Sequence, residues 1–270
     1  KIDDLGGDDV ILTGSGQKWL LGGDGKDTIK AGVDLATGAP LPIASDHIVV
    51  GDNAEFSYVV DATTGVGTGK VLRYETTDTV AATGGDDVIL LGDGNNVVLG
   101  GMGADTITTG VGVDTIFGDN GYVQMDAVGG NLAAFGTKSQ PSTTGTVKIT
   151  DLGGNDVIVT QSGDKWLVGG DGADQISATV GNHTVVGDNA EFSYVALGST
   201  GAGKVLRYET TDTVAATGGN DMILLGDGNN VVLGGMGADQ ITTGVGIDTI
   251  FGDNGYVQMD AVGGNLAAFG

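Results

Sequence analysis

Aspartates that recur at a fixed place in a nine-residue pattern are the residues best suited to chemistry in this sequence. The clearest stretch runs from Ala82 to Phe117 and divides into ATGGDDVIL, LGDGNNVVL, GGMGADTIT and TGVGVDTIF. Each nonapeptide has Gly at position 4, Asp or Asn at position 6 and an apolar residue at position 8. An aspartate supplies hard oxygen ligands, and glycine allows a tight turn in which backbone carbonyl oxygens point inward. The pattern therefore indicates oxygen sites for a divalent cation.

A turn followed by a very short strand is the element that would position these aspartates. Glycine permits positive φ in the turn, positions 7 to 9 are extended, and position 8 points into a core. Apolar residues are 40% of the chain and recur regularly, which argues against low-complexity disorder despite 53 glycines. The predicted core residues are Ile11, Leu20, Ile29, Val49, Ile89, Val98, Ile107, Ile116, Ile158, Leu167, Ile176, Val185, Ile223, Val232, Ile241 and Ile250.

Four nonapeptides, GGDGKDTIK (Gly22 to Lys30), GGMGADTIT, GGDGADQIS and GGMGADQIT, carry a fuller motif. They resemble the calcium-binding repeats of the repeats-in-toxin (RTX) family, G-G-x-G-x-D-x-U-x, over roughly half of the chain. The resemblance implies an all-β fold, a parallel β-roll (β-solenoid) with two nonapeptides per turn and turns stacked about 4.8 Å apart. It also implies multiple Ca2+ ions, held by carbonyl and aspartate oxygens from neighbouring loops. The segments between the nonapeptides are predicted as inserted antiparallel β-hairpins.

Alternation of the loops between two edges of the roll gives a sharper expectation. The position 6 residues of one edge are all aspartates: Asp9, Asp27, Asp87, Asp105, Asp156, Asp174, Asp221 and Asp239. Those of the other edge are mixed: Lys18, His47, Asn96, Asp114, Lys165, His183, Asn230 and Asp248. Half of these residues bind calcium poorly, and Lys18 and Lys165 put an ammonium group where a cation would lie. We therefore expect one continuous calcium edge and one incomplete edge, on which Asp114 and Asp248 each hold a lone or weak site.

The full set of predicted metal ligands adds the aspartates that open other loops, among them those of four Gly-Asp-Asn triplets. The added residues are Asp24, Asp52, Asp119, Asp171, Asp188 and Asp253. The alternative interpretation is that all these aspartates only form Asx turns. Stacked carboxylates a few ångströms apart would then repel without compensation, so we favour metal binding and expect folding to depend on calcium.

Long repeats divide the chain into two parts. Residues Lys70–Gly136 recur almost unchanged as Lys204–Gly270, 134 residues further on. We expect a first long repeat over 1–147 and a second over 148–270, each with two quarters and a hairpin insertion per quarter. The first copy also carries a surface loop near Val33–Ser45. The hairpin that starts at Gly121 is expected to return through GTVKITD, which leaves the last hairpin incomplete and makes Lys1–Asp4 an equivalent return arm.

Composition excludes several other classes of protein. A formal net charge of −24 argues against nucleic acid and anionic membrane surfaces, and no apolar run is long enough for membrane insertion. With no cysteine there is no disulfide or thiol chemistry. No nucleophile–histidine–acid grouping is recognisable, so we expect no enzyme. His47 and His183 are interpreted as turn residues in aspartate positions, and Trp19 and Trp166 as side chains that pack under a hairpin.

The leading hypothesis is a structural, calcium-stiffened segment of a bacterial secreted or cell-surface protein, such as an adhesin stalk, surface layer or self-assembling filament. Its partners would be neighbouring repeats or identical chains, end to end. The alternative is an RTX accessory module of a type I-secreted hydrolase or toxin. An ice-binding surface is disfavoured, because the outward rows are broken by Val, Leu, Trp, Gln and Phe.

Overall fold

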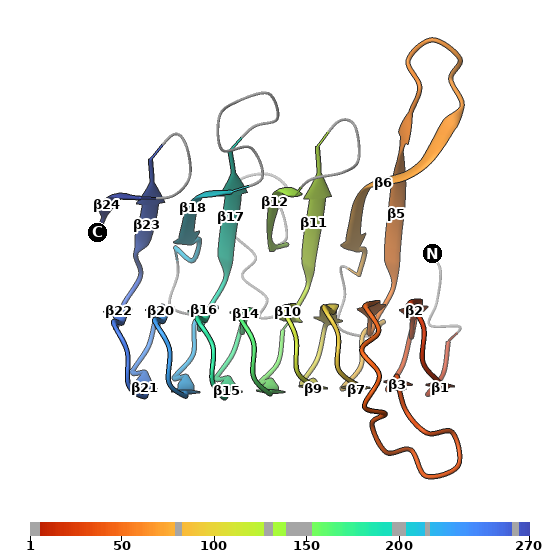
Figure 1. Cartoon of the computed structure of the whole chain (residues 1–270), viewed down its shortest axis with the longest axis horizontal. Helices are drawn as coiled ribbons and strands as arrows, with labels where there is room; N and C mark the ends of the chain where they lie inside the picture. The colour runs from red at the N-terminus through yellow and green to blue at the C-terminus, as the bar shows by residue number, and fades with distance from the viewer. Residues whose placement is uncertain are drawn as a thin grey trace.

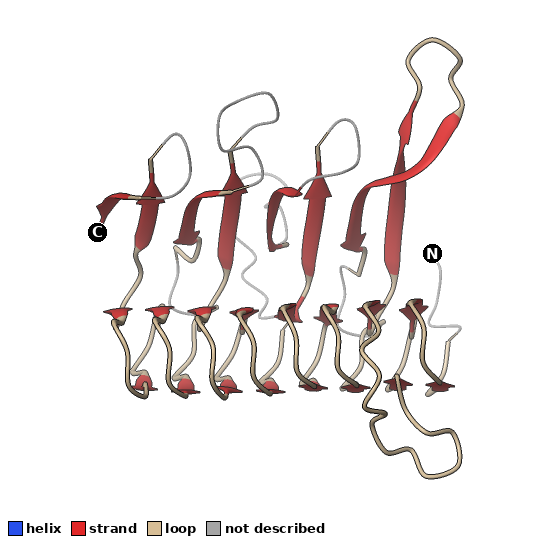
Figure 2. Ribbon diagram, in the orientation of Figure 1, coloured by secondary structure: helices blue, strands red, loops and turns tan. Residues whose placement is uncertain are grey.

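A computed structural model describes residues 6–78, 83–126, 132–138, 153–195, 204–213, 217–260 and 265–270. In these ranges the chain forms strands, turns and loops (Figure 2), and no helix there is long and apolar enough to cross a membrane. The strands make three eight-stranded sheets. The all-β architecture that the nonapeptides predict is therefore confirmed.

Two parallel sheets face each other and form the roll (Figure 1). The first sheet consists of β1 (Val10–Thr13), β3 (Thr28–Ala31), β7 (Val88–Leu91), β9 (Thr106–Thr109), β13 (Val157–Thr160), β15 (Gln175–Ala178), β19 (Met222–Leu225) and β21 (Gln240–Thr242). The second consists of β2 (Lys18–Leu21), β4 (His47–Val50), β8 (Val97–Gly101), β10 (Asp114–Asp119), β14 (Lys165–Val168), β16 (Thr184–Val186), β20 (Val231–Leu233) and β22 (Thr249–Phe251). Because consecutive nonapeptide strands belong to opposite sheets, the loops alternate between two edges as predicted.

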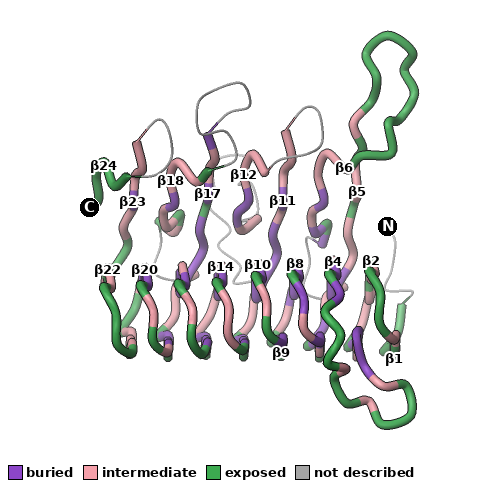
Figure 3. Tube along the Cα trace, in the orientation of Figure 1, coloured by how far each residue is buried: buried purple, intermediate pink, exposed green. Residues whose placement is uncertain are grey.

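The core of the roll is the row of position 8 side chains between the two sheets. Parallel pairing places these residues directly over one another, as with Ile29, which pairs with Ile11 on one side and Ile89 on the other. Ile29 and Ile89 are fully buried, and burial of such a side chain contributes about 1.5–3 kcal/mol. Ile250 of the last second-sheet strand is 46% exposed. Figure 3 shows that the turn at β22 is exposed or half-buried, whereas the middle turns carry more buried residues.

The third sheet is antiparallel and is built from the inserted hairpins. Its strands are β5 (Ala54–Val60), β6 (Gly67–Thr76), β11 (Gly121–Met125), β12 (Leu132–Thr137), β17 (Ala190–Tyr194), β18 (Val205–Thr210), β23 (Tyr256–Met259) and β24 (Leu266–Phe269). Each hairpin leaves the roll at the same edge, two turns after the previous one. Two turns of the roll rise by about 9.6 Å, and one two-stranded hairpin is about 9.6 Å wide in its sheet. Neighbouring hairpins therefore lie close enough to pair with each other.

A second apolar core lies between the hairpins and the outer side of the second sheet. Phe135 of β12 is fully buried there, stacked on Phe192 at 4.4 Å and edge-on to Trp166 at 5.9 Å. Trp19 stacks on Phe56 of the first hairpin at 5.5 Å. The prediction that both tryptophans pack under hairpins is confirmed, and the aromatic residues explain how the hairpins attach to the roll.

The predicted return arm of the second hairpin type is wrong. Gly121–Met125 pairs with Leu132–Thr137 instead of GTVKITD, and Tyr256–Met259 pairs with Leu266–Phe269, so the last hairpin has both arms. GTVKITD and Lys1–Asp4 lie outside the described residues. Leu132–Thr137 pairs with β17 on its other side, and its Phe135 packs against Trp166. These contacts with later parts of the chain stabilise it as the returning strand.

The extra stretch near Val33–Ser45 is a loop, as predicted, and it leaves the roll on the edge opposite the hairpins. Its ends are anchored: Val33 is buried, and the Ser45 hydroxyl accepts a hydrogen bond from the Gly16 N–H at 2.8 Å. The loop therefore enlarges one turn without changing the pairing of β3 with β7 or of β4 with β8.

Candidate metal edge

Eight aspartates form one continuous hydrogen-bond ladder along the edge where the second sheet leads into the first, here called the first edge. The backbone N–H of each of the first seven aspartates donates to Oδ1 of the aspartate one turn further on, at 2.7 Å for Asp9 to Asp27 and 2.9 Å for Asp221 to Asp239. The ladder runs through Asp9, Asp27, Asp87, Asp105, Asp156, Asp174, Asp221 and Asp239. The structure thus brings together the eight residues that the nonapeptide phase places on one edge.

In seven of the eight ladder aspartates the other carboxylate oxygen, Oδ2, is buried and has no hydrogen-bond partner among the described residues. This is true of Oδ2 of Asp27, Asp87, Asp105, Asp156, Asp174, Asp221 and Asp239. A buried carboxylate oxygen with neither a donor nor a cation is costly, because water no longer solvates its charge. A row of such oxygens, one turn apart, requires positive charge beside it.

Backbone carbonyl oxygens of glycines line the same space. A methyl group on Gly118 would lie 1.9 Å from Oδ2 of Asp156 and 2.5 Å from the carbonyl oxygen of Gly169. The same pairing of one aspartate Oδ2 with one glycine carbonyl recurs at Gly22, Gly51, Gly100, Gly169, Gly187 and Gly234. Converging carboxylate and carbonyl oxygens are the ligands that calcium prefers, so the residues of the first edge fit Ca2+. The ion would neutralise the stacked carboxylates of adjacent turns.

The electrostatics of the chain without metal agree with this fit. Burial is the main cause that raises the pKa of Asp87 and of Asp221 to about 7. In the middle of the roll the pKa of Asp105 lies well above its usual range, first because of burial and then because of the charge of Asp156. Folding without a cation therefore favours protonated carboxyl groups near neutral pH, and protons compete with metal for these oxygens.

The Gly-Asp-Asn aspartates have a hydrogen-bonding role that the sequence does not reveal. The buried Asp52 carboxylate accepts the N–H groups of Gly85 and Met102, which ties the foot of a hairpin to the next turn. Asp119 and Asp188 repeat this with the amides of Gly154 and Asp171, and of Gly219 and Met236. Asp253 is exposed at the last turn. That these four aspartates bind metal stays a prediction.

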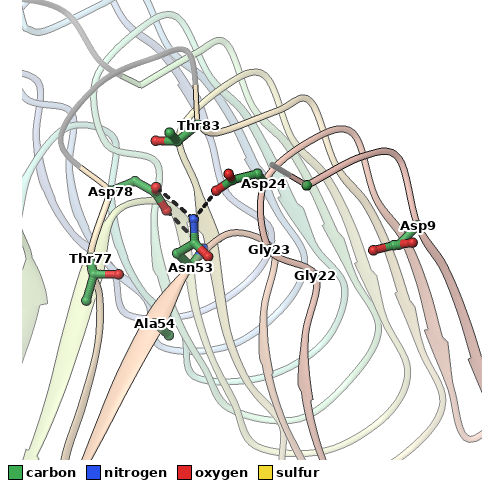
Figure 4. A pocket seen from close by; sticks show the side chains of 10 residues that line it. Asp9, Gly22, Gly23, Asp24, Asn53, Ala54, Thr77, Asp78 and Thr83 are labelled. Carbon is green, nitrogen blue, oxygen red and sulfur yellow. Dashed lines mark hydrogen bonds between the residues drawn. The ribbon is translucent and has the colours of Figure 1, made fainter. Parts of the chain in front are cut away.

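Asp24 and Asp171 turn toward the feet of hairpins rather than into the ladder. Figure 4 shows the Asn53 amide between Asp24 and Asp78; Nδ2 donates to both carboxylates, and the Asn53 N–H donates to Asp78 Oδ2 at 2.9 Å. Asn189 makes the same contacts with Asp171 and Asp212. Asp78 and Asp212 were missed, because a single acid after the hairpin sequence RYETT belongs to no periodic pattern.

The opposite edge, here called the second edge, carries the loops from the first sheet to the second. The structure argues against a lone calcium site at Asp114, because Oδ2 accepts from Lys165 Nζ at 2.6 Å and from Thr109 Oγ1 at 2.7 Å. Asp248 accepts from the backbone and side-chain amides of Asn230 at 2.9 and 3.0 Å, and its weak site stays a prediction. His47 and His183 keep the ladder position: the N–H of each donates to an asparagine Oδ1 one turn on.

Comparison with protein families gives an independent result. A family model described as the RTX calcium-binding nonapeptide repeat matches residues 3–34, 74–107, 92–123, 150–185, 208–241 and 233–256, more than half of the chain. Comparison with curated proteins and with solved structures gave no significant match. The matched ranges include each of the eight aspartates of the first-edge ladder.

Proposed function

The chain belongs to the family of RTX calcium-binding nonapeptide repeats, and from this membership we propose that it is a structural segment of a bacterial extracellular protein. As a member, it is a calcium-binding repeat module for multiple Ca2+ ions, and proteins with such repeats are generally secreted by bacteria. The finer proposal is a non-catalytic stalk, surface-layer or filament segment at the cell surface, without nucleic-acid or membrane-inserted partners. Residues 1–147 and 148–270 are proposed as its two repeating units.

Stiffness along the roll is the first support for this proposal. Three sheets run the full length of the described roll, so each pair of adjacent turns is linked by strand pairing in the two parallel sheets, and the hairpins add a third connection. The first-edge aspartates add a fourth line of contacts, in which the ionised carboxylates of adjacent turns repel one another unless cations lie between them. Calcium would therefore convert a self-repelling acidic chain into a continuous rod.

The junction between the two long repeats is the single observation that carries the end-to-end part of the proposal. At this junction Phe135 is fully buried against Trp166 and Phe192. The equivalent residues at the two ends of the roll are open: Phe269 is 57% exposed and Trp19 is 43% exposed. A further unit that repeats the internal junction would bury both, and exposed apolar surface of this kind is typical of a contact site.

Sedimentation velocity with electron microscopy, in millimolar calcium and in excess chelator, tests the proposal. We expect calcium to fold the chain and to produce end-to-end particles that lengthen with protein concentration, and we expect Phe269→Ser to bind calcium normally while shortening them. Folding in calcium with strictly monomeric particles would refute the end-to-end contact and favour the accessory module. A chain folded equally well in chelator would refute the structural role of calcium.

A further inference from the structure

We infer that the second edge holds no calcium in its Lys165–Asp114 loop pair, and that the Lys165 ammonium group occupies the place of the cation. The evidence comes from the same pair of turns on the two edges. On the first edge Asp105 is followed one turn later by Asp156, a carboxylate over a carboxylate. On the second edge, β10 and β14 pair in parallel and place Lys165 directly over Asp114.

The Lys165 side chain is fully buried, which is rare for lysine unless its charge is compensated. Its Nζ lies 2.6 Å from Asp114 Oδ2, 2.7 Å from the Gly112 carbonyl oxygen and 3.3 Å from the Gly110 carbonyl oxygen. These three oxygens all belong to one loop of the preceding turn. An ammonium group has three N–H donors, so one lysine satisfies a carboxylate and two carbonyls that would otherwise attract a metal ion.

Both carboxylate oxygens of Asp114 already accept hydrogen bonds. Besides Lys165 and Thr109, which donate to Oδ2, the backbone N–H and the side-chain amide of Asn96 donate to Oδ1 at 2.9 and 3.0 Å. The first-edge aspartates of the same turns, Asp105 and Asp156, each keep a buried Oδ2 without a hydrogen-bond partner in the part of the chain that the structure describes. The difference between the edges is therefore chemical: one presents open oxygens, and the other presents oxygens that already have nitrogen donors.

Three other loops of the second edge also place a side-chain nitrogen beside oxygens, whereas both ring nitrogens of His47 are buried without a hydrogen-bond partner among the described residues. Lys18 Nζ donates to the carbonyl oxygens of Ser15 and Gly16 at 2.8 and 2.9 Å. His183 Nε2 lies 3.0 Å from the Thr179 carbonyl oxygen. Asn230 Nδ2 lies 3.0 Å from Asp248 Oδ1 and faces the Gly226 and Gly228 carbonyls at longer range. The Lys165–Asp114 pair is the strongest member of this set, because both charges are fully buried.

The consequence is a joint between the long repeats whose two sides differ in metal dependence. On the first edge calcium would link the two turns, whereas on the second edge the ion pair between Lys165 and Asp114 links them. Replacing Lys165 by aspartate would place a carboxylate over the Asp114 carboxylate, as on the first edge. The carbonyl oxygens of Gly110 and Gly112, which now accept hydrogen bonds from Lys165, would lie beside this pair. A single substitution should therefore create a calcium site.

The test counts calcium ions per folded chain by native mass spectrometry and by equilibrium dialysis, with circular dichroism as the measure of folding. We expect Lys165→Asp to bind one ion more than the unmodified chain, whereas Lys165→Met gains none and unfolds at a lower temperature. Lys70→Asp, which makes the same charge change at an exposed hairpin residue, should leave the number of bound ions unchanged. Asp114→Asn should also leave the ion number of the otherwise unmodified chain unchanged.

Two results would overturn the inference. One is a folded Lys165→Asp chain that binds no additional ion, which would mean that the second-edge loop is not a cation cradle. The other is loss of an ion in Asp114→Asn, which would mean that calcium already binds beside Lys165. Either outcome leaves calcium binding by the first edge intact, because Asp156→Asn reports on that edge separately through the loss of a first-edge ion.

Discussion

Gly118→Ala adds one methyl group to the middle of the first edge. Gly118 is not among the glycines with positive φ, so alanine fits the backbone, and the substitution tests only the space around the new side chain. That space is occupied by two oxygens: the methyl carbon would lie 1.9 Å from Asp156 Oδ2 and 2.5 Å from the Gly169 carbonyl oxygen. Real Cβ atoms essentially never approach closer than 3.0 Å, so both oxygens must move away.

The expected size of the effect has two parts. Loss of one ion costs about 2.7 kcal/mol when free calcium is about 100 times its Kd. Overpacking of a buried site adds about 1–3 kcal/mol. We therefore expect Gly118→Ala to destabilise the calcium-bound fold by roughly 4–6 kcal/mol.

Gly252→Ala is a control at the matching position of the second long repeat. Gly252 also opens a Gly-Asp-Asn triplet at the end of a second-sheet nonapeptide, but among the described residues nothing lies within 4 Å of a Cβ built on it. Its expected effect is within about 0.5 kcal/mol. Calcium titrations and thermal unfolding followed by far-ultraviolet circular dichroism, with a calcium count by native mass spectrometry, compare the two variants.

Equal behaviour of the two alanine variants would refute the assignment of these oxygens to calcium. The same conclusion would follow if Gly118→Ala were destabilised but kept every ion, because the clash would then be purely steric. A lost ion together with lost stability, in Gly118→Ala alone, is the result that the geometry of Asp156 and Gly169 predicts.

Three further predictions concern the metal, pH and the hairpin sheet. Chelation of calcium at pH 8 should abolish most of the β-sheet circular dichroism signal, and readdition should restore it. Because burial raises the pKa of Asp52 to about 9, of Asp188 to about 8 and of Asp87 to about 7, the metal-free fold binds more protons than the unfolded chain. That contribution is fully present below about pH 4 and is lost as pH rises through 7–9, so a pH titration in chelator should show structure gained on acidification; no gain would contradict it. Phe135→Ala should cost about 3–5 kcal/mol in thermal or denaturant unfolding, whereas its counterpart Phe269→Ala, 57% exposed, should cost less than about 1 kcal/mol.

The roll could be predicted from the sequence because each of its requirements is local. A nonapeptide needs positive φ at its turn, which Gly25 (φ 116°) and Gly172 (φ 111°) adopt, an apolar residue at position 8 and an oxygen ligand at position 6. Counting in nines then assigns every loop to an edge. The position of Asp27 and its equivalents on one edge follows from this count without any knowledge of distant contacts.

Contacts between distant residues account for what the sequence did not predict. The sequence places the Lys165 ammonium group where a cation would lie, but it did not predict the pairing of Lys165 Nζ with the carboxylate of Asp114, 51 residues earlier. The return strand Leu132–Thr137 has weak alternation, with two alanines and a glycine, and its place depends on β17 and Trp166. Asp52 looks like a ligand next to glycine, but its carboxylate accepts the N–H groups of Gly85 and Met102 in the next turn.

The match between one hairpin and two turns of the roll has a consequence for how such a gene can change. Unequal recombination between the near-identical stretches Lys70–Gly136 and Lys204–Gly270 would add or delete a whole number of turns and of hairpins together. Every added block would meet its neighbours with strands, aromatic residues and charged loops already in phase. Array length could then vary between lineages without any compensating mutation elsewhere in the protein.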